Sequence, residues 1–199
     1  MKKKKRKQGF WKSNYKKSWD YLRDCKNSFI IIIGIFVVSM LAGGLLPVPE
    51  IIGVWIKKTI TDLVNATEGL NVYGLIRFIL FNNGGVSFFS IILGFFFGVV
   101  PIITTIANGY MLGVVSKAVI IQEGFLELWR LLPHGIFELP AVIISLGLGL
   151  KFGMFIFQDD PGKEFVNRLV SGLRVFIFVV LPLLIIAAII ESILIHFLG

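Results

Sequence analysis

The stretch LLPHGIFELPA, residues 131–141, places a histidine and a glutamate four positions apart in a segment that is otherwise almost wholly apolar. Proline suits the first turn of a helix, so a helix that begins at Pro133 would carry His134 and Glu138 one turn apart on the same face. An imidazole and a carboxylate so arranged can bind a divalent metal or exchange a proton. Because an ionisable residue at membrane depth is costly and rarely faces lipid, we expect the pair to face the interior and to mark a site.

Metal binding is one interpretation of this pair, and zinc is the divalent ion that best suits the two ligands. A catalytic zinc usually takes three ligands from the protein, however, and the metalloprotease pattern HExxH is absent from the sequence. The sequence therefore requires no cofactor. Pro140 adds an acceptor to the same helix, because it cannot donate a hydrogen bond to the carbonyl oxygen of Ile136.

Other polar residues in the apolar segments could join His134 and Glu138 in a buried polar cluster. The last apolar segment offers Glu191 and His196. A plain hydrogen bond between His134 and Glu138, with no further role, is the simpler interpretation of the same residues. The candidates in the central apolar block are Asn82, Asn83, Thr104, Thr105 and Asn108.

Composition shows which elements must position these residues. Hydrophobic residues make up 56% of the 199-residue chain and charged residues only 16%, which is more apolar side chain than a soluble domain of this size could bury. Residues 1–26 hold eleven of the twenty Lys and Arg but only two acidic residues, Asp20 and Asp24. Basic residues beside a span favour the cytoplasmic side and the anionic leaflet. We therefore expect a multi-pass protein of the cytoplasmic membrane that has its N terminus inside and does not bind nucleic acid.

The apolar runs predict an all-α fold, a polytopic transmembrane helical bundle with about five spans. A basic cytoplasmic tail, residues 1–27, precedes a transmembrane domain of residues 28–199. The second and third spans form a short central hairpin that reverses near Pro101, where a helix break is tolerated if protein packs around it. The spans are expected at about residues 29–46, 86–101, 102–121, 133–157 and 175–197.

Orientation follows from the number of spans. With the N terminus inside, five spans place the basic segment 158–174 inside and the C terminus outside, whereas four spans would place that segment outside. The basic residues of this segment favour five spans. The longest loop, residues 48–81, then lies outside the cytoplasm, and the apolar residues on one helical face of it predict an interfacial helix or a docking face for protein partners.

The basic tail itself has a helical pattern. Trp11, Tyr15, Trp19 and Leu22 recur at helical spacing among lysines. Such a helix would lie along the lipid headgroups with its aromatic side chains inserted, so membrane lipids are expected partners and protein partners are a second option for the tail. A disordered basic leader that only sets orientation is the alternative.

Small residues indicate how the spans pack, because membrane helices associate by close approach of their backbones. The pairs in the two central spans would let these spans form a close antiparallel hairpin, and the third pair could serve the bundle or a second copy of the protein. A homo-oligomer, with a dimer the simplest, is therefore expected. The three GxxxG pairs are Gly94 and Gly98, Gly109 and Gly113, and Gly149 and Gly153.

Several of these motifs together resemble those of the stage II sporulation protein M family. The resemblance implies a five-span helical membrane protein that anchors a complex of peptidoglycan-degrading partners during engulfment in spore-forming bacteria, and that has no accepted catalytic activity of its own. The motifs that carry it are NN at 82–83, GxxxG at 94–98, NGxxxG at 108–113 and LPHGIFELPA at 132–141.

Three functions are compatible with the sequence. The first is a non-enzymatic membrane scaffold whose polar cluster fixes the bundle while the tail and the outer loop recruit lipid or partner proteins. The second is an intramembrane metal-dependent, hydrolase-like protein that uses His134 and Glu138, with Asn108 as a third contact. The third is a transporter of a small solute or ion. Family resemblance favours the scaffold.

Overall fold

The computed structural model describes residues 9–198, with the side chains of 129–134 and 198 left aside. This part of the chain is helical throughout and has no strand, as the sequence predicts. Five helical segments are long and apolar enough to cross a membrane. The protein is therefore a multi-span membrane protein with an all-α fold, which confirms the expected architecture.

The helices follow one another with short connections. Three short 3₁₀ segments, η1, η2 and η3, and one π-helical segment, η4, extend or join the α-helices. The bounds are α1 Phe10–Asp24, α2 Lys26–Leu45, α3 Glu50–Thr67, α4 Val72–Ile92, η1 Leu93–Phe95, α5 Val99–Gln122, η2 Phe125–Leu131, α6 Leu132–Gly153, η3 Met154–Phe157, α7 Pro161–Val175, η4 Phe176–Val180 and α8 Leu181–Leu198.

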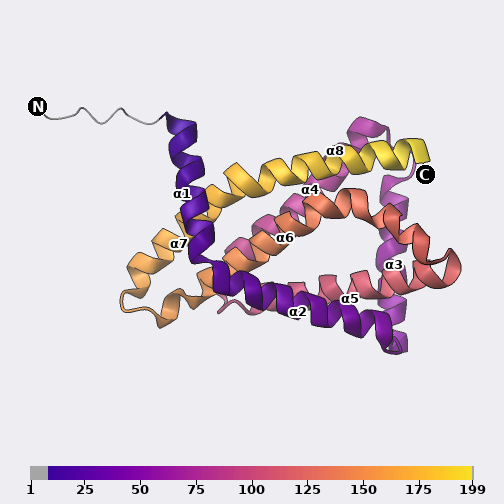
Figure 1. Cartoon of the computed structure of the whole chain (residues 1–199), viewed down its shortest axis with the longest axis horizontal. Helices are drawn as coiled ribbons and strands as arrows, with labels where there is room; N and C mark the ends of the chain where they lie inside the picture. Colours follow the sequence, from indigo (N-terminus) through magenta and orange to yellow (C-terminus); the bar gives the residue numbers. More distant parts are fainter. Residues whose placement is uncertain (1–8, 199) are drawn as a thin grey trace, which may run out of the picture.

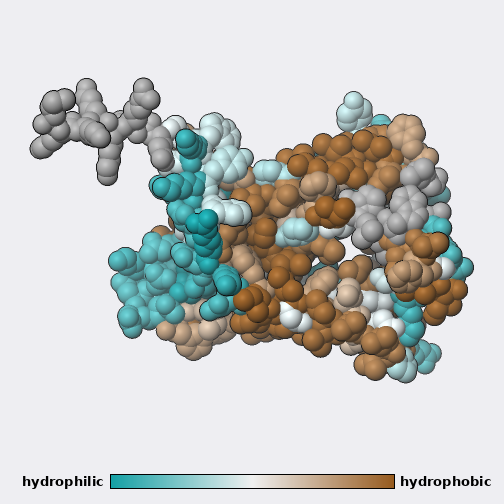
Figure 2. Space-filling model, in the orientation of Figure 1, coloured by the Kyte–Doolittle hydropathy of each residue, from teal (hydrophilic) through white to brown (hydrophobic). Residues whose placement is uncertain are grey.

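The spans run lengthwise through the molecule, while α1 and α3 lie across its two opposite ends (Figure 1). The centre of the bundle is α6, which packs against α2, α4, α5 and α8. Its spanning window is 56% buried, whereas no other span exceeds 28%. Lipid would cover the apolar outer surface of the other spans, which Figure 2 shows as a broad brown area bounded on one side by the polar α1 and α7.

Residues of the tail form helix α1, as their helical pattern predicts, and its position along the lipid headgroups stays a prediction. Its rings pack on a residue of the π-helical segment: the ring centroids of Trp11 and Tyr15 lie 5.5 and 5.6 Å from that of Phe178. Trp11 and Trp19 nevertheless stay 66% and 58% exposed. Helix α1 lies across one end of the spans.

The second span begins earlier than predicted. The spanning helix runs from Val72 to Phe95, so the predicted outer loop 48–81 contains α3 and the first part of α4, and the predicted start at residue 86 is wrong. Asn71 caps this helix, because its side chain accepts a hydrogen bond of 2.9 Å from the N–H of Gly74. The polar residues that look like an entrance to the span thus lie inside it.

The reversal between α4 and α5 also differs from the prediction. Phe97 and Gly98 adopt positive φ angles of 54° and 72°, and this left-handed pair turns the chain. Pro101 lies in the first turn of α5, where a missing N–H costs little. Pro133 is the second residue of α6, as expected, and α6 continues through Pro140.

Glycines bring the helices into close contact, but the partners are not those expected. A Cβ on Gly94 would meet the carbonyl oxygen of Gly149, and a Cβ on Gly153 would meet backbone atoms of both Gly94 and Gly98. The first and third GxxxG pairs therefore join η1 and its turn to α6. The predicted contact of Gly94 and Gly98 with the pair in α5 is wrong.

The pair in α5, Gly109 and Gly113, packs against α2 instead. A Cβ on Gly109 would lie 2.6 Å from the carbonyl oxygen of Phe36, and a Cβ on Gly113 would meet that of Met40. From the side of α2, Gly43 approaches the backbone of Tyr110. The α2–α5 pair is the most extensive helix contact of the described chain.

The last span is part of one long continuous helix. The segment from Pro161 to Phe197 is continuous, with the π-helical turn η4 between α7 and α8. The first part, α7, is amphipathic and lies at the same end of the bundle as α1. The predicted last span, 175–197, thus corresponds to η4 and α8, and the connecting segment 158–174 is mostly the helix α7.

Labelling should reveal the two ends of the bundle as opposite sides of the membrane. In a Cys25→Ala background, we expect Asn65→Cys in α3 and Lys163→Cys in α7 to react with an impermeant maleimide from opposite sides, because both positions are exposed and lie at opposite ends. The native Cys25 is buried, and burial raises the pKa of its thiol to about 11, so it should label slowly in any case. Labelling of both positions from the same side would contradict the five-span topology.

Candidate functional site

A cavity of about 240 Å³ lies between α2, α5 and α6. A water molecule occupies roughly 30 Å³ in the liquid, so the cavity has room for several waters or a small solute. Most of its lining is apolar, and α5 and α6 each contribute four residues to it while α2 contributes one. The residues that line it are Phe36, Asn108, Met111, Leu112, Val115, Gly135, Glu138, Leu139 and Val142.

Two of the predicted site residues, Asn108 and Glu138, meet at this cavity. Gly109 packs against α2, and Asn108, the residue before it in α5, lines the cavity beside that contact. The Nδ2 of Asn108 donates a hydrogen bond of 2.8 Å to the carbonyl oxygen of Thr104. That bond holds the side-chain amide of Asn108 in one orientation, in which its Oδ1 can accept a hydrogen bond.

Glu138 is half-buried on α6. It lies close enough to Glu191 on α8 for the two carboxyl groups to repel each other electrostatically. Glu191, a candidate partner from the sequence, therefore lies within electrostatic range of Glu138.

The other predicted members of the polar cluster lie elsewhere. Asn82 and Asn83 are on α4, where the Nδ2 of Asn82 donates a hydrogen bond of 3.1 Å to the Oδ1 of Asn83. Thr105 is buried and donates to the carbonyl oxygen of Pro101, four residues earlier in its own helix, at 2.7 Å. Five of the seven predicted residues thus divide into a cavity pair, a pair on α4 and a threonine bonded within its own helix. Thr104 provides the carbonyl oxygen that accepts from Asn108, and the side chain of His134 is not among the described ones.

A metal site needs more ligands than the described side chains bring together. Within the described residues, no three His, Cys, Asp or Glu come close enough to hold a metal ion. The side chain of His134 lies outside the described residues, so the structure places only its backbone, one turn before Glu138 in α6. Metal binding by His134 and Glu138 stays a prediction.

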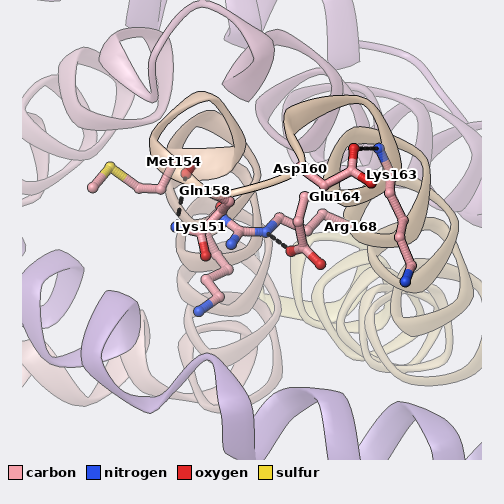
Figure 3. A network of polar contacts seen from close by, with 7 residues as sticks. All are labelled: Lys151, Met154, Gln158, Asp160, Lys163, Glu164 and Arg168. Atoms are coloured by element: carbon pink, nitrogen blue, oxygen red, sulfur yellow. Dashed lines mark hydrogen bonds and ion pairs between the residues drawn. The ribbon is translucent and has the colours of Figure 1, made fainter.

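A buried cation at the other end of α6 was missed by sequence reasoning. Arg168 of α7 is only 5% exposed, and Figure 3 shows it between the end of α6 and the start of α7. Its Nε donates to Glu164 at 2.8 Å, and its NH1 donates to the carbonyl oxygen of Lys151 at 2.7 Å. Arg168 therefore provides a hydrogen-bond donor for a carbonyl oxygen in the last turn of α6, and this bond connects α6 to α7.

Residues of the tail complete this polar junction. Tyr21 and Cys25 interact with each other and lie within electrostatic range of Arg168, and burial raises the pKa of both side chains above their ordinary values. At neutral pH both groups are therefore uncharged. A sequence signal for Arg168 exists, since Glu164 and Arg168 have the four-residue spacing of a helical ion pair in an amphipathic segment.

Comparison with known proteins connects this architecture to a family. The family model described as Stage II sporulation protein M matches residues 28–194. No curated protein and no solved structure matched the chain. The matched region contains most of α2, all of α3 to α7 and most of α8, and therefore the cavity and Arg168, whereas α1 precedes it. Because the match covers most of the sequence, the chain belongs to the stage II sporulation protein M family.

Proposed function

We propose that the protein is a non-enzymatic membrane scaffold, a multi-span anchor that organises a complex at the membrane surface. The observation that carries this proposal is the pair of helices outside the spans, α1 and α3, which lie across opposite ends of the bundle. Each presents large apolar side chains away from the protein's own core. A protein built this way offers one contact surface on each side of the membrane.

Helix α3 is the surface proposed for protein partners. Ile56 anchors it, since this side chain is only 4% exposed, whereas Ile51 and Trp55 are 84% and 54% exposed. Between α3 and the end of α5 lies a cavity of about 410 Å³ that Ile56 and Ile60 line. Exposed Trp and large aliphatic side chains on an anchored helix are typical of the side chains that fill pockets on a partner protein.

Helix α1 is the surface proposed for lipid. Its exposed side chains combine Trp11 and Trp19 with Lys12, Lys16 and Lys17. Aromatic rings insert at the level of the headgroups, and each lysine near an anionic surface contributes roughly 1 kcal/mol of attraction. This contact would hold α1 against the membrane while α7 and Phe178 hold it against the bundle.

The partner surface can be tested by photo-crosslinking in native membranes. A photoreactive amino acid placed at Ile51 or Trp55 should yield discrete protein adducts, because these positions point away from the bundle. The same group at Ile56 provides a matched control on α3 that faces α5 and should yield no adduct to another protein. Adducts to lipid alone from positions 51 and 55 would contradict a partner-binding role for α3.

Metal content distinguishes the scaffold from the intramembrane metal site. The cavity lined by Glu138 and Asn108 is the observation that favours the second candidate. Two protein ligands from the HxxxE motif are too few for tight zinc binding, so we expect no retained metal after a chelator wash of the purified protein. Elemental mass spectrometry of wild type and of His134→Ala measures this. About one ion per chain in wild type, lost in the variant, would make the metal site the leading function.

A further inference from the structure

Asn82 and Asn83 lie near the centre of the second span, and the surface around them is not covered by the protein itself. The span extends from Val72 to Phe95, which places these residues close to its midpoint. Asn82 is exposed, and its hydrogen bond goes to the neighbouring Asn83. One bond cannot satisfy two amides, each of which has two N–H donors and a carbonyl acceptor. Lipid at this depth offers no partner for the remaining groups.

The surface beside Asn82 allows another helix to approach closely. Among the residues that the structure describes, a Cβ on Gly84 or Gly85 would meet no atom within 4 Å, so both glycines border open space there. Phe81 and Phe89 flank them and are 72% and 57% exposed. Asn82, Gly85 and Phe89 follow one another at spacings of three and four residues and therefore share one face of α4.

A shallow groove extends this face toward the outer end of α4. It has a volume of about 570 Å³ and is lined by Gly74, Phe78 and Asn82, which lie one helical turn apart, and by Arg77, whose guanidinium lies over the ring of Phe81. The opposite face of α4 is the one that packs into the bundle, where Ser87 and Ser90 are 0% and 3% exposed. The helix thus has one face used within the chain and one free face with a polar centre.

We propose that this face of α4, centred on Asn82 and Gly85, is the surface through which two copies of the protein associate. Copies inserted in the same orientation can form a closed pair only about a two-fold axis along the membrane normal. Each residue of α4 then meets its own counterpart at the same depth. Amides are self-complementary, since each can donate to and accept from an identical group, so Asn82 would pair with Asn82 of the second copy.

Gly84 and Gly85 of α4 are better placed to contact a second copy than the other glycine pair, because they make no close contact with another described helix. Gly149 and Gly153, the pair that the sequence offers for a second copy, are already in contact with Ser90, Gly94 and Gly98 of the same chain. Gly84 and Gly85 have no such contact. This inference does not depend on the scaffold function, because it concerns only how two copies meet.

A bulky residue at position 85 tests the proposal without disturbing the fold of one copy. A Cβ at position 85 would meet no atom of the described residues, whereas the leucine of Gly85→Leu blocks close approach of a second α4, and we expect association to weaken by about tenfold or more. Gly34→Leu is the matched control: Gly34 also lies in mid-span, in α2, and its Cβ would also meet open space. Förster energy transfer between labelled copies in liposomes, measured against lipid-to-protein ratio, gives the association constant. A monomeric wild type, or equal weakening by both variants, would overturn the proposal.

Cysteine crosslinking in native membranes tests the geometry separately. In a Cys25→Ala background, single cysteines at 82, 85 and 89 should form disulfide-linked dimers on mild oxidation, whereas a cysteine at 87, on the buried face, should not. Asn82→Leu should weaken association about three- to tenfold and Asn82→Gln should retain most of it, because glutamine keeps the amide. Crosslinking without this helical periodicity would contradict a parallel α4 contact.

Discussion

Gly149→Ala is expected to destabilise the protein by about 3 kcal/mol, because the new methyl group has no space. A Cβ at this position would meet the backbone carbonyl oxygen of Ser90 and would lie 2.7 Å from Cγ of Pro101. Both neighbours belong to rigid helices, α4 and α5, so neither can move aside as a flexible side chain would. Relief requires α6 to shift away from two helices at once.

The measurement is thermal unfolding in a mild detergent, followed by the loss of helical circular dichroism. Gly34→Ala is the control, since its methyl group meets no atom and alanine favours a helix over glycine by up to about 1 kcal/mol. We expect a clear drop in Tm for Gly149→Ala and an unchanged or raised Tm for Gly34→Ala. Equal Tm values for Gly149→Ala and wild type would refute the close packing of α6 against α4 and α5.

Arg168→Met is expected to cost a similar amount, about 3 kcal/mol, since it breaks a buried ion pair and leaves its partners without a donor. The carbonyl oxygen of Lys151 would lose its bond of 2.7 Å at the end of α6, and Glu164 would lose its counter-ion at 2.8 Å. The change should loosen α7 from α6. Limited proteolysis between α6 and α7 should therefore speed up, along with a lower Tm.

Two further variants separate charge from geometry. Arg168→Lys retains the charge but has no planar fork with which to donate to Lys151 and Glu164 together, so we expect it to recover only part of the loss. Lys163→Met removes an exposed cation from the same helix and should change Tm little. Full recovery in Arg168→Lys would show that charge alone matters at this junction.

The sequence was sufficient for the number of spans because hydropathy alone determines which segments are stable in lipid. It failed for the start of the second span, because Asn82 and Asn83 look like an entrance but lie inside the span. A helix in lipid tolerates polar residues at its centre when a partner satisfies them, and hydropathy contains no information about partners. The true start depends on the capping side chain of Asn71, a signal that a single short motif carries weakly.

The turn between α4 and α5 and the candidate site also depend on contacts that the sequence alone does not reveal. Proline is a strong indicator of a break, so the reversal was placed at Pro101, but the turn required the left-handed conformation of Phe97 and Gly98. For the site, shared depth in the membrane was enough to associate Asn108 with Glu138, and the cavity contains both. Depth does not reveal which face each helix presents, and the hydroxyl of Thr105, predicted to join them, instead donates within its own helix.

The contact between α2 and α5 has a consequence for biogenesis. These two helices form the most extensive pair, yet α3 and α4 are synthesised between them. From Leu45 at the end of α2 to Gln122 at the end of α5 the ribosome adds about 80 residues, which takes on the order of 4 to 15 s at about 5–20 residues per second. During that time α2 must reside in the bilayer without its partner. The composition of α2 allows this, because its mean hydropathy is 2.5, compared with 1.6 for the spans of α4 and α5. Those two helices enter the bilayer when earlier helices are already there.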